Sequence, residues 1–357
     1  CDVDEPGWRR GDGVGCRSMA GARFGGAGAV FGRLVVGVHG AGLDQRVGIR
    51  ENGERAALLR TAVIDPVELK FGGRLDFSTS MMLKRQLRDF RPHVALTWMN
   101  RATSKMPRRR PSDLDYVLAA RLGGYYNLKY YRHCDHLVGN TPDICDYLKG
   151  QGWPEERTHY LPNFVAADVA PAISPKLLNL PERARFILTL GRLHENKAFD
   201  TLIRALVDVP ETYLVIAGEG PERERLESLA TELGVRPRIR MAGWRDDVPS
   251  LMAACSVFVC PSRHEPLGNV VIEGWAQSRP VVAAASQGPS QLINDGKDGL
   301  LTPVDDAPAM ALAIKRVLGD AALADSLAQA GRARYQAEFT EAQVVQQYLN
   351  FFQEIAG

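Results

Sequence analysis

The sequence has no long apolar run. A membrane-spanning helix needs about 20 consecutive apolar residues, and no segment of this 357-residue chain approaches such a run. The beginning also lacks the basic and then apolar pattern of a secretory signal. We therefore expect a cytoplasmic protein, either free in solution or attached peripherally to the inner face of the cell membrane.

Cysteine is scarce and the net charge is small. The six cysteines form no C-x-x-C pair and no regular framework, which indicates reduced, mostly buried thiols and predicts no metal site. A formal net charge of +2 argues against binding nucleic acid through a broad basic surface. The fingerprint G-x-G-x-x-G is also absent, which argues against a nicotinamide-dependent oxidoreductase.

The length is sufficient for two domains, because single hydrophobic cores stop growing at roughly 250–300 residues. From residue 183 onward, short apolar segments alternate with amphipathic helical patterns. This alternation predicts an α/β fold with a parallel, doubly wound sheet, in which ligands bind in the loops after the strands. The predicted strands are Phe186–Leu190, Tyr213–Ala217, Ile239–Ala242, Val257–Cys260, Pro280–Ala284 and Gly299–Thr302.

The first half is less regular. Residues 1–33 are crowded with Gly and Arg and have neither helical nor strand periodicity, so we expect an irregular start. Strands are predicted at Leu34–Val38 and Val94–Trp98, and a run of prolines predicts an inter-domain linker. The expected organisation is a first domain at 34–166, a linker at 167–182 and a second domain at 183–340.

One candidate chemical loop, Gly191–Lys197, follows a predicted strand and precedes a helix. Arg192 and Lys197 place two permanent cations at the mouth of the sheet. A guanidinium fork and a compact ammonium group suit a diphosphate whose charge grows as a bond to it breaks. A solvated basic loop with no ligand is the alternative interpretation.

A second loop, Pro261–Glu273, carries two carboxylates, Glu265 and Glu273, across a Gly-Asn break. We expect Asn269 to cap the following helix, so that both carboxylates face one ligand and accept hydrogen bonds from sugar or ribose hydroxyls. The N–H groups near Gly268–Val270 direct the positive end of the helix dipole at a phosphate. The alternative is two glutamates with no shared role.

Together, these elements resemble the nucleotide-sugar-binding domain of glycosyltransferase family 4. The resemblance covers residues 186–340 and implies the GT-B fold, in which two Rossmann-like parallel-sheet domains face a cleft and a C-terminal helix at 341–357 packs back on the first domain. The matching motifs are G-R-x-x-x-x-K at Gly191–Lys197, E-x7-E at Glu265–Glu273, G-P at Gly288-Pro289 and D-G-x-x-G-L-L at Asp295–Leu301.

The resemblance also implies a role for each matching residue. Arg192 and Lys197 hold the donor diphosphate, while Glu265 binds the donor sugar; these three form the expected catalytic set. Glu273 binds the ribose. The other donor-binding candidates are Gly191, Gly243, Trp244, Arg245, Pro266, Leu267, Gly268, Asn269 and Val270. The cleft loops of the first half supply the acceptor-side candidates Asn100, Arg101 and Tyr126.

The implied reaction transfers a hexose-like sugar from a UDP- or GDP-linked donor to a cell-surface glycan or glycolipid, of the lipopolysaccharide type. Enzymes of this family retain the anomeric configuration and usually work without a metal or a bound cofactor. Two alternatives stay open. One is a nucleotide-sugar epimerase of the same fold, and the other is an impaired transferase relic that only binds nucleotide.

A basic stretch lies in the first half. Between Arg101 and Arg132 there are eight Lys or Arg residues against two Asp, and Lys105–Arg110 is the densest part. Tyrosines follow closely, at positions 125, 126, 130 and 131. We interpret Lys105–Arg110 as a surface that docks on an anionic membrane; a plain solvated loop is the alternative.

Overall fold

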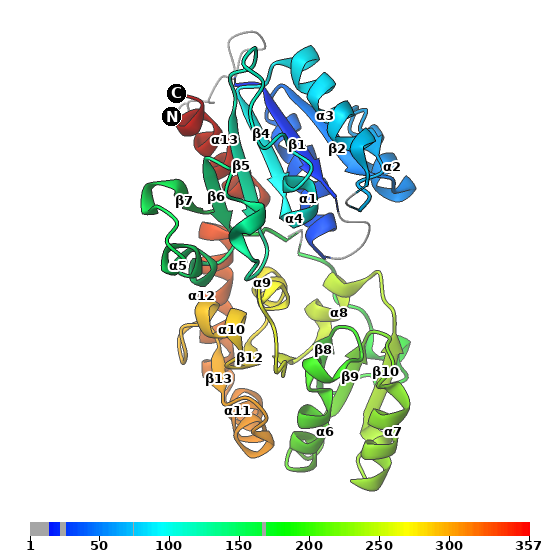
Figure 1. The fold of residues 1–357 in the computed structure, drawn as a ribbon. Coiled ribbons are helices and arrows are strands. Elements are labelled where there is room, and N and C mark those ends of the chain that lie inside the picture. The colour runs from blue at the N-terminus through cyan, green and yellow to red at the C-terminus, as the bar shows by residue number, and fades with distance from the viewer. Residues whose placement is uncertain (1–13, 22–25, 74, 166–168) are drawn as a thin grey trace, which may run out of the picture. The chain divides into compact units, whose positions relative to one another are not determined.

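The computed structural model describes residues 14–21, 26–73, 75–165 and 169–357. The chain divides into two compact units (Figure 1). Unit 1 comprises Cys1–Asn163 and Glu341–Gly357, and unit 2 comprises Phe164–Thr340. The chain therefore passes from unit 1 into unit 2 and returns to unit 1 for its last helix.

Unit 1 is built on a sheet that has seven strands within its described residues, in the order β3-β2-β1-β4-β5-β6-β7. Every neighbouring pair is parallel, and the strand order reverses beside β1, as in doubly wound folds. The strands are β1 (Cys16–Ala20), β2 (Gln45–Arg50), β3 (Val67–Leu69), β4 (Val94–Trp98), β5 (Val117–Leu122), β6 (His136–Gly139) and β7 (Thr158–Tyr160).

Helices connect these strands. The helix α3 shows why: Leu83 and Leu87 lie on its buried side, and the Asp76 carboxylate caps its start by accepting the Thr79 N–H. The helical segments are α1 (Gly26–Gly40), α2 (Gly53–Thr61), α3 (Phe77–Phe90), α4 (Met99–Thr103), η1 (Leu128–Tyr130), α5 (Pro142–Gly150), η2 (Glu155–Arg157) and α13 (Glu341–Ala356).

The last helix, α13, is part of the core of unit 1. It contacts α1 and β4, and it buries Tyr348 and Phe352. The Tyr348 hydroxyl accepts a hydrogen bond from Nε of Arg121 in β5, at 2.9 Å. The Arg121 guanidinium also stacks over the Trp98 ring, 4.1 Å from its centroid, so an apolar layer and one buried cation hold the returning helix in place.

The start of unit 1 differs from the expected irregular segment and from the strand predicted at Leu34–Val38. Residues 16–20 form β1, between β2 and β4, and residues 34–38 lie inside α1. Arg17 and Ser18 are buried in β1, so this strand lacks the apolar run expected of an inner parallel strand. The sequence of α1 is apolar or glycine on almost every side, which hides its helical period. Residues 1–13 and 22–25 lie outside the described residues.

Unit 2 contains a second parallel sheet, with six strands across the part of the unit that the structure describes, in the order β10-β9-β8-β11-β12-β13. The predicted strands are confirmed to within one residue at each end. The strands are β8 (Phe186–Leu190), β9 (Tyr213–Ala217), β10 (Ile239–Gly243), β11 (Val257–Cys260), β12 (Val281–Ala284) and β13 (Leu300–Thr302).

Helices cover both faces of this sheet and form two buried layers. One layer joins α6, α7 and α11 to the strands, and the other joins α8, α9 and the end of α12. The helical segments are η3 (Pro175–Leu178), η4 (Glu195–Lys197), α6 (Phe199–Val207), α7 (Arg223–Glu232), η5 (Arg236–Arg238), α8 (Val248–Ala254), α9 (Asn269–Ala276), α10 (Gln287–Leu292), α11 (Ala307–Gly319) and α12 (Ala321–Glu338).

The predicted linker at 167–182 is wrong for its described residues, which belong to unit 2. Leu178 and Leu180 are buried in the same core layer as Trp275, and so is Val165, just before the segment. The prolines support the compact turn η3, which begins with Pro175, instead of an exposed connection. Residues 166–168 lie outside the described residues.

Candidate functional site

Two loops of unit 2 begin at the reversal in strand order. β8 and β11 are neighbouring parallel strands, with Leu188 paired beside Phe258. The segments after them, 191–198 and 261–268, therefore leave the same edge of the sheet next to each other. A reversal of this kind leaves a crevice at the carboxyl ends of the strands, where doubly wound folds bind ligands. The topology thus brings the two predicted chemical loops together.

Glycines allow the segment after β8 to lie directly against the segment after β9, and the segment after β9 to lie against the end of β10. The Gly191 N–H donates to the Ala217 carbonyl at 3.0 Å, and the Gly218 N–H donates to the Gly243 carbonyl at 2.7 Å. A Cβ at position 220 would lie 2.4 Å from the Leu193 carbonyl oxygen. In the sequence, a Gly-x-Gly directly after a predicted strand marks Gly218 and Gly220 as a tight turn that shapes the site without a chemical role.

Lys197 and Glu265 form an ion pair between the two loops. The Lys197 side chain is 24% exposed and the Glu265 side chain 12%. Lys197 ends η4, which begins where the His194 ring accepts the Asn196 N–H. The Asn196 carbonyl in turn accepts the His264 N–H at 3.2 Å. Two members of the predicted catalytic set are therefore in direct contact in a partly buried position.

Arg263, which sequence reasoning missed, ties the same loops together. Its guanidinium donates to both carboxylate oxygens of Asp200 at 3.0 and 2.9 Å, lies 2.6 Å from the Asp305 carboxylate, and donates to the Glu195 carbonyl at 2.7 Å. Burial alone raises the pKa of Asp200, but the hydrogen bonds and charge of Arg263 outweigh burial, and the pKa is lowered. Arg263 thus fixes the loop that carries Glu265.

The helix α9 begins at this edge, and its cap differs from the prediction. Asn269 is its first residue, while the capping position belongs to Gly268, with φ +67° and no side-chain cap hydrogen bond. The close packing of Gly288 explains the tight turn: its N–H donates to the Glu265 carbonyl at 2.7 Å, and a Cβ there would lie 2.6 Å from the Gly268 nitrogen. The first N–H groups of a helix lack intrahelical partners and so favour an anion.

The remaining residues of this segment lie around the start of α9. Pro266, Leu267 and Val270 are partly exposed. Glu273 lies one turn into α9 and is also partly exposed. The glutamates therefore sit on either side of the helix start, one in the loop and one on the helix.

Arg192 and the loop after β10 complete the donor-side candidates. Arg192 is exposed and forms no ion pair within the described part of the chain. Gly243 ends β10 with φ +69°. Trp244 is 78% exposed, and Arg245 is held by both carboxylate oxygens of Asp247, at 2.8 and 2.6 Å. The exposed indole donates its N–H to the Asp246 carboxylate at 3.1 Å and presents an aromatic surface next to Gly243.

The acceptor-side candidates Asn100, Arg101 and Tyr126 belong to unit 1. Asn100 and Arg101 lie on α4, directly after β4. Oδ1 of Asn100 is buried without a hydrogen-bond partner among the described residues. The Tyr126 carbonyl accepts a hydrogen bond from the Tyr147 hydroxyl at 3.0 Å, and burial raises the pKa of the Tyr126 phenol.

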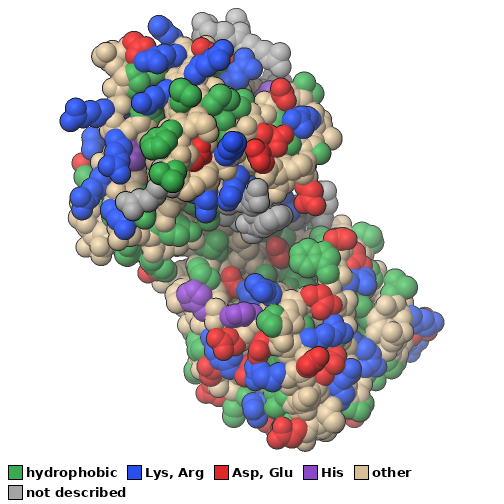
Figure 2. Space-filling view, turned by 45° about the vertical axis from the view of Figure 1, so that its right-hand side comes forward, with side chains coloured by type: hydrophobic (Ala, Val, Ile, Leu, Met, Phe, Trp, Pro, Cys, Tyr) green, Lys and Arg blue, Asp and Glu red, His purple; other side chains and the backbone are tan. Residues whose placement is uncertain are grey.

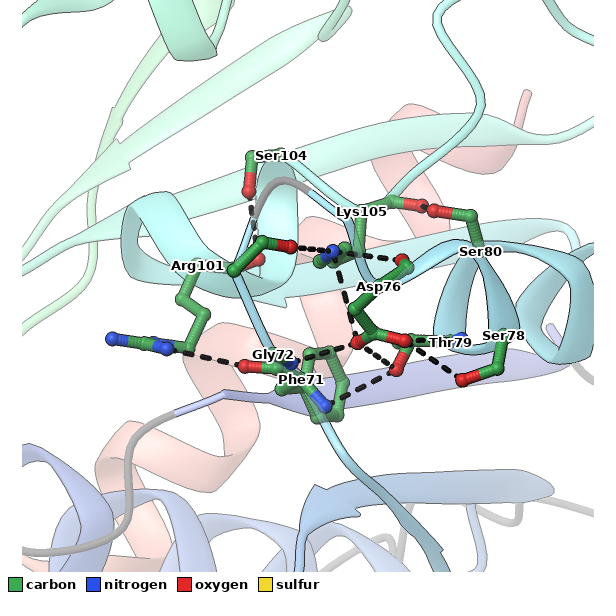
Figure 3. A network of polar contacts seen from close by, with 10 residues as sticks. Phe71, Gly72, Asp76, Ser78, Thr79, Ser80, Arg101, Ser104 and Lys105 are labelled. Atoms are coloured by element: carbon green, nitrogen blue, oxygen red, sulfur yellow. Dashed lines mark hydrogen bonds and ion pairs between the residues drawn. The ribbon is translucent and has the colours of Figure 1, made fainter.

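Arg101 and Lys105 belong to a polar network around the start of α3 (Figure 3). Arg101 donates to the Phe71 carbonyl at 3.1 Å. The Lys105 ammonium donates to the Gly73 and Asp76 carbonyls at 2.8 and 2.9 Å and is only 7% exposed. The expectation that Lys105 belongs to a docking surface is therefore wrong, because its charge is satisfied inside the protein. Arg108 and Arg109 are exposed.

No group of three or more His, Cys, Asp or Glu side chains is placed to bind a metal ion in the part of the chain that the structure describes. Over the same residues, no helix has the length and apolarity needed to cross a membrane.

Sequence comparison identifies related proteins. The family profile described as "Glycosyl transferases group 1" matches residues 173–334. The lipopolysaccharide core biosynthesis glycosyltransferase LpsE of Rhizobium meliloti is 37% identical over 270 residues, which cover 75% of this chain and 78% of LpsE. LpsD of the same organism is 34% identical over 335 residues, which cover 92% of this chain and 95% of LpsD.

Comparison with solved structures gives the fold. Anabaena Alr3699/HepE, solved in complex with UDP, superposes with a TM-score of 0.83 at 18% sequence identity. The superposition covers 96% of this chain and 100% of HepE. The two parallel sheets are those of GT-B glycosyltransferases, and the chain belongs to the group 1 family of glycosyltransferases.

Proposed function

We propose that this chain is a retaining, family 4 hexosyltransferase that uses a nucleoside-diphosphate sugar and acts on a lipopolysaccharide-core-like acceptor. The names of LpsE and LpsD support the acceptor class, and the UDP complex of HepE supports a uridine-linked donor. GDP is the second donor nucleotide to test. The finer assignments rest on the local chemistry of unit 2.

The observation that carries the proposal is the Lys197–Glu265 pair at the reversal in strand order. The Lys197 ammonium, the exposed Arg192 and the first N–H groups of α9 provide positive charge at one edge of the sheet. Glu265 balances one of these charges within the chain. A diphosphate bound at this edge would contact the Lys197 ammonium, the Arg192 guanidinium and the positive end of the α9 dipole. These groups stabilise the negative charge of a diphosphate leaving group.

The chemical step follows from these positions. The bond between the sugar C1 and the diphosphate oxygen breaks, and the acceptor hydroxyl oxygen bonds to C1 on the same face. The hydroxyl proton passes to the departing diphosphate oxygen, so no separate protein base is needed. Arg192 and Lys197 stabilise the negative charge that grows on the diphosphate, which removes the need for a divalent cation.

The remaining contacts supply orientation. Glu265 accepts hydrogen bonds from donor-sugar hydroxyls, and Glu273 accepts them from the ribose. The backbone of Pro266–Gly268 and the start of α9 at Asn269 and Val270 lie against the sugar and phosphate. The exposed Trp244 ring, between Gly243 and Arg245, offers a stacking surface for the base.

The proposed acceptor and membrane contacts lie on unit 1. Asn100, Arg101 and Tyr126 are the acceptor-side residues. For membrane docking, the burial of Lys105 shifts the proposed surface to Arg108 and Arg109. The exposed apolar residues just before and at the start of α3, namely Leu75, Phe77 and Met81, complete this surface. Lys and Arg side chains lie among hydrophobic ones on the face of unit 1 that Figure 2 shows, a composition suited to an anionic lipid surface.

The test is calorimetric titration of UDP, GDP and ADP into the purified protein, with and without Mg²⁺. We expect one nucleotide to bind equally well in both buffers and to bind at least tenfold more weakly to Lys197→Ala, because a charge-assisted contact is lost. Lys315→Ala is the matched control, since Lys315 is an exposed lysine of unit 2.

Product analysis distinguishes a transferase from an epimerase and from a relic that only binds nucleotide. Incubation with the sugar nucleotide and a lipopolysaccharide-core acceptor must give a glycoside with the donor's anomeric configuration. An epimerised sugar nucleotide formed without acceptor, or nucleotide binding with no turnover under any condition, contradicts the proposal.

A further inference from the structure

Unit 1 contains a pocket of about 300 Å³ that the proposed transfer reaction does not use. Its lining comes from β1, β2, the segment at β3 and the last turns of α3. Arg17 and Arg46 are the second residues of β1 and β2, so the pocket is near the amino ends of these strands. The acceptor-side candidates Asn100 and Arg101 instead follow the carboxyl end of β4.

Two arginines lie next to each other in this pocket. Arg17 and Arg46 are direct partners in the parallel ladder between β1 and β2, so their side chains leave the same face of the sheet on neighbouring strands. Like charges in this relation repel each other. The Arg46 guanidinium lies over the Phe90 ring, 5.5 Å from its centroid, which positions the charge without neutralising it.

Arg17 is the more unusual of the two. Its side chain is 2% exposed, and it has no carboxylate within ion-pair distance among the described residues. It donates from Nη2 to the Gln86 amide oxygen, while its Nε has no hydrogen-bond partner in the described structure. Burial and, next, the charge of Arg46 lower the pKa of Arg17 to about 10, so the guanidinium is still charged at neutral pH. A buried charge without a counter-charge is strongly unfavourable.

The acidic residues of the lining do not balance these arginines. Asp65 and Asp89 also line the pocket, but Asp65 pairs with Arg60 at 3.5 Å and Asp89 with Arg85 at 3.7 Å. Both carboxylates are largely exposed, at 91% and 66% of their side-chain surfaces. The lining residues together carry two positive and two negative charges, but both carboxylates pair with arginines outside the lining, and neither pairs with the buried Arg17.

We infer that this pocket binds a small phosphate monoester between Arg17 and Arg46. A phosphate monoester carries nearly two negative charges at neutral pH, whereas a ligand with one carboxylate carries only one. The monoester therefore balances the charges of two guanidinium groups more closely. Each guanidinium presents a fork of donors that fits phosphate oxygens, and the Gln86 amide nitrogen is a further donor. Val47 and Phe90 give apolar surface to the organic part, and the volume is at the lower end of ordinary ligand pockets.

The experiment measures the binding of inorganic phosphate at constant ionic strength, by calorimetry. All proteins carry Lys197→Ala, so that the proposed diphosphate contacts of unit 2 are weakened and cannot account for the signal. We expect saturable millimolar binding that Arg46→Gln or Gln86→Leu weakens by about tenfold or more. The matched control is Arg33→Gln, because Arg33 is an exposed arginine of unit 1 outside the pocket lining. It should bind phosphate as its parent does.

Arg17→Met gives a second, independent readout. Without phosphate, we expect its melting temperature to equal or exceed that of the parent, because an uncompensated buried charge has been removed. Phosphate should raise the melting temperature of the parent and leave that of Arg17→Met unchanged. The inference is overturned if the parent shows no saturable binding up to about 50 mM phosphate, or if Arg46→Gln and Arg17→Met respond to phosphate as Arg33→Gln does.

Discussion

A Cβ atom at position 218 would lie 1.9 Å from the carbonyl oxygen of Gly191. Gly218 also has φ +150°, a conformation that L side chains rarely adopt. We therefore expect Gly218→Ala to lower the free energy of unfolding of unit 2 by about 2–4 kcal/mol and to displace the loop that carries Arg192, as measured by urea unfolding and nucleotide titration.

Two further glycines separate the effect of backbone strain from the effect of contact with Gly191. Gly234 has φ +70° with open space around its Cβ position, and Gly150 has open space without a positive φ. Gly234→Ala should lose about 1 kcal/mol from backbone strain alone, and Gly150→Ala should be neutral or stabilising. Equal losses at positions 218 and 234 would mean that contact with Gly191 has no energetic importance.

Lys197→Ala and Glu273→Ala should abolish sugar transfer with little loss of fold. Lys197 interacts with the growing charge of the leaving group, so kcat/KM should fall by at least about 100-fold. Both side chains are partly exposed, and circular dichroism should stay native. Normal transfer rates in either variant, measured with the nucleotide identified by titration, would remove the proposed donor site.

Arg263→Leu should destabilise the loop that carries Glu265 without removing a direct contact to the donor. It leaves Asp200, whose side chain is 15% exposed, without its bidentate partner, and we expect a loss of about 2 kcal/mol in the free energy of unfolding. KM for the donor should rise because Glu265 loses its fixed position. The control is Arg204→Leu, at an exposed position of α6, which should unfold like the wild type in a urea titration.

The Asp76 carboxylate predicts a pH-dependent stability of unit 1. Burial raises its pKa, but hydrogen bonds from Thr79, Ser78 and Gly72 together lower it below the ordinary value. A lowered pKa means that the stabilisation is complete above about pH 4, the pKa of an unfolded aspartate, and is lost as the pH falls through the lower folded pKa. Asp76→Asn should therefore unfold more easily than wild type at pH 7, and the difference should shrink towards pH 2. A constant difference over this range would contradict the assignment.

Binding to lipid vesicles tests the docking surface. Wild-type protein should bind vesicles that contain anionic phosphatidylglycerol and leave purely zwitterionic ones unbound. A Phe77→Ser/Met81→Ser variant and an Arg108→Gln/Arg109→Gln variant should each lose about tenfold in partitioning. Leu312→Ser changes a similarly exposed apolar residue, on α11 of unit 2, and should leave partitioning unchanged in a sedimentation assay.

The sequence predicted unit 2 far better than the start of unit 1. Strands such as Val257–Cys260 are continuous apolar runs between turn signals, so their limits can be read directly. β1 contains the buried Arg17 and Ser18, and no local pattern distinguishes it from a loop. The strand predicted at Leu34–Val38 lies inside the helix α1, whose residues are nearly all apolar or small and so hide the helical period.

The candidate site could be predicted only as separate loops. The motifs identify Lys197 and Glu265, but their ion pair joins residues far apart in sequence and depends on β8 lying beside β11. The Arg263–Asp200 contact has the same long-range origin, and no spacing rule indicates it. The burial of Lys105 could not be predicted either, since a run of basic residues does not tell which of them faces inward.

The return of the chain to unit 1 through α13 determines an order of assembly. During synthesis, every described strand and helix of unit 2 emerges before α13 does. Unit 2 can therefore finish folding while the sheet of unit 1 still lacks the helix that contacts α1 and whose Tyr348 hydroxyl accepts the hydrogen bond from Arg121. In a ribosome-bound chain stalled before Glu341, unit 2 should resist proteolysis, whereas unit 1 should still expose the apolar surface that α13 covers. Unit 1, although most of it is synthesised first, therefore completes its folding last.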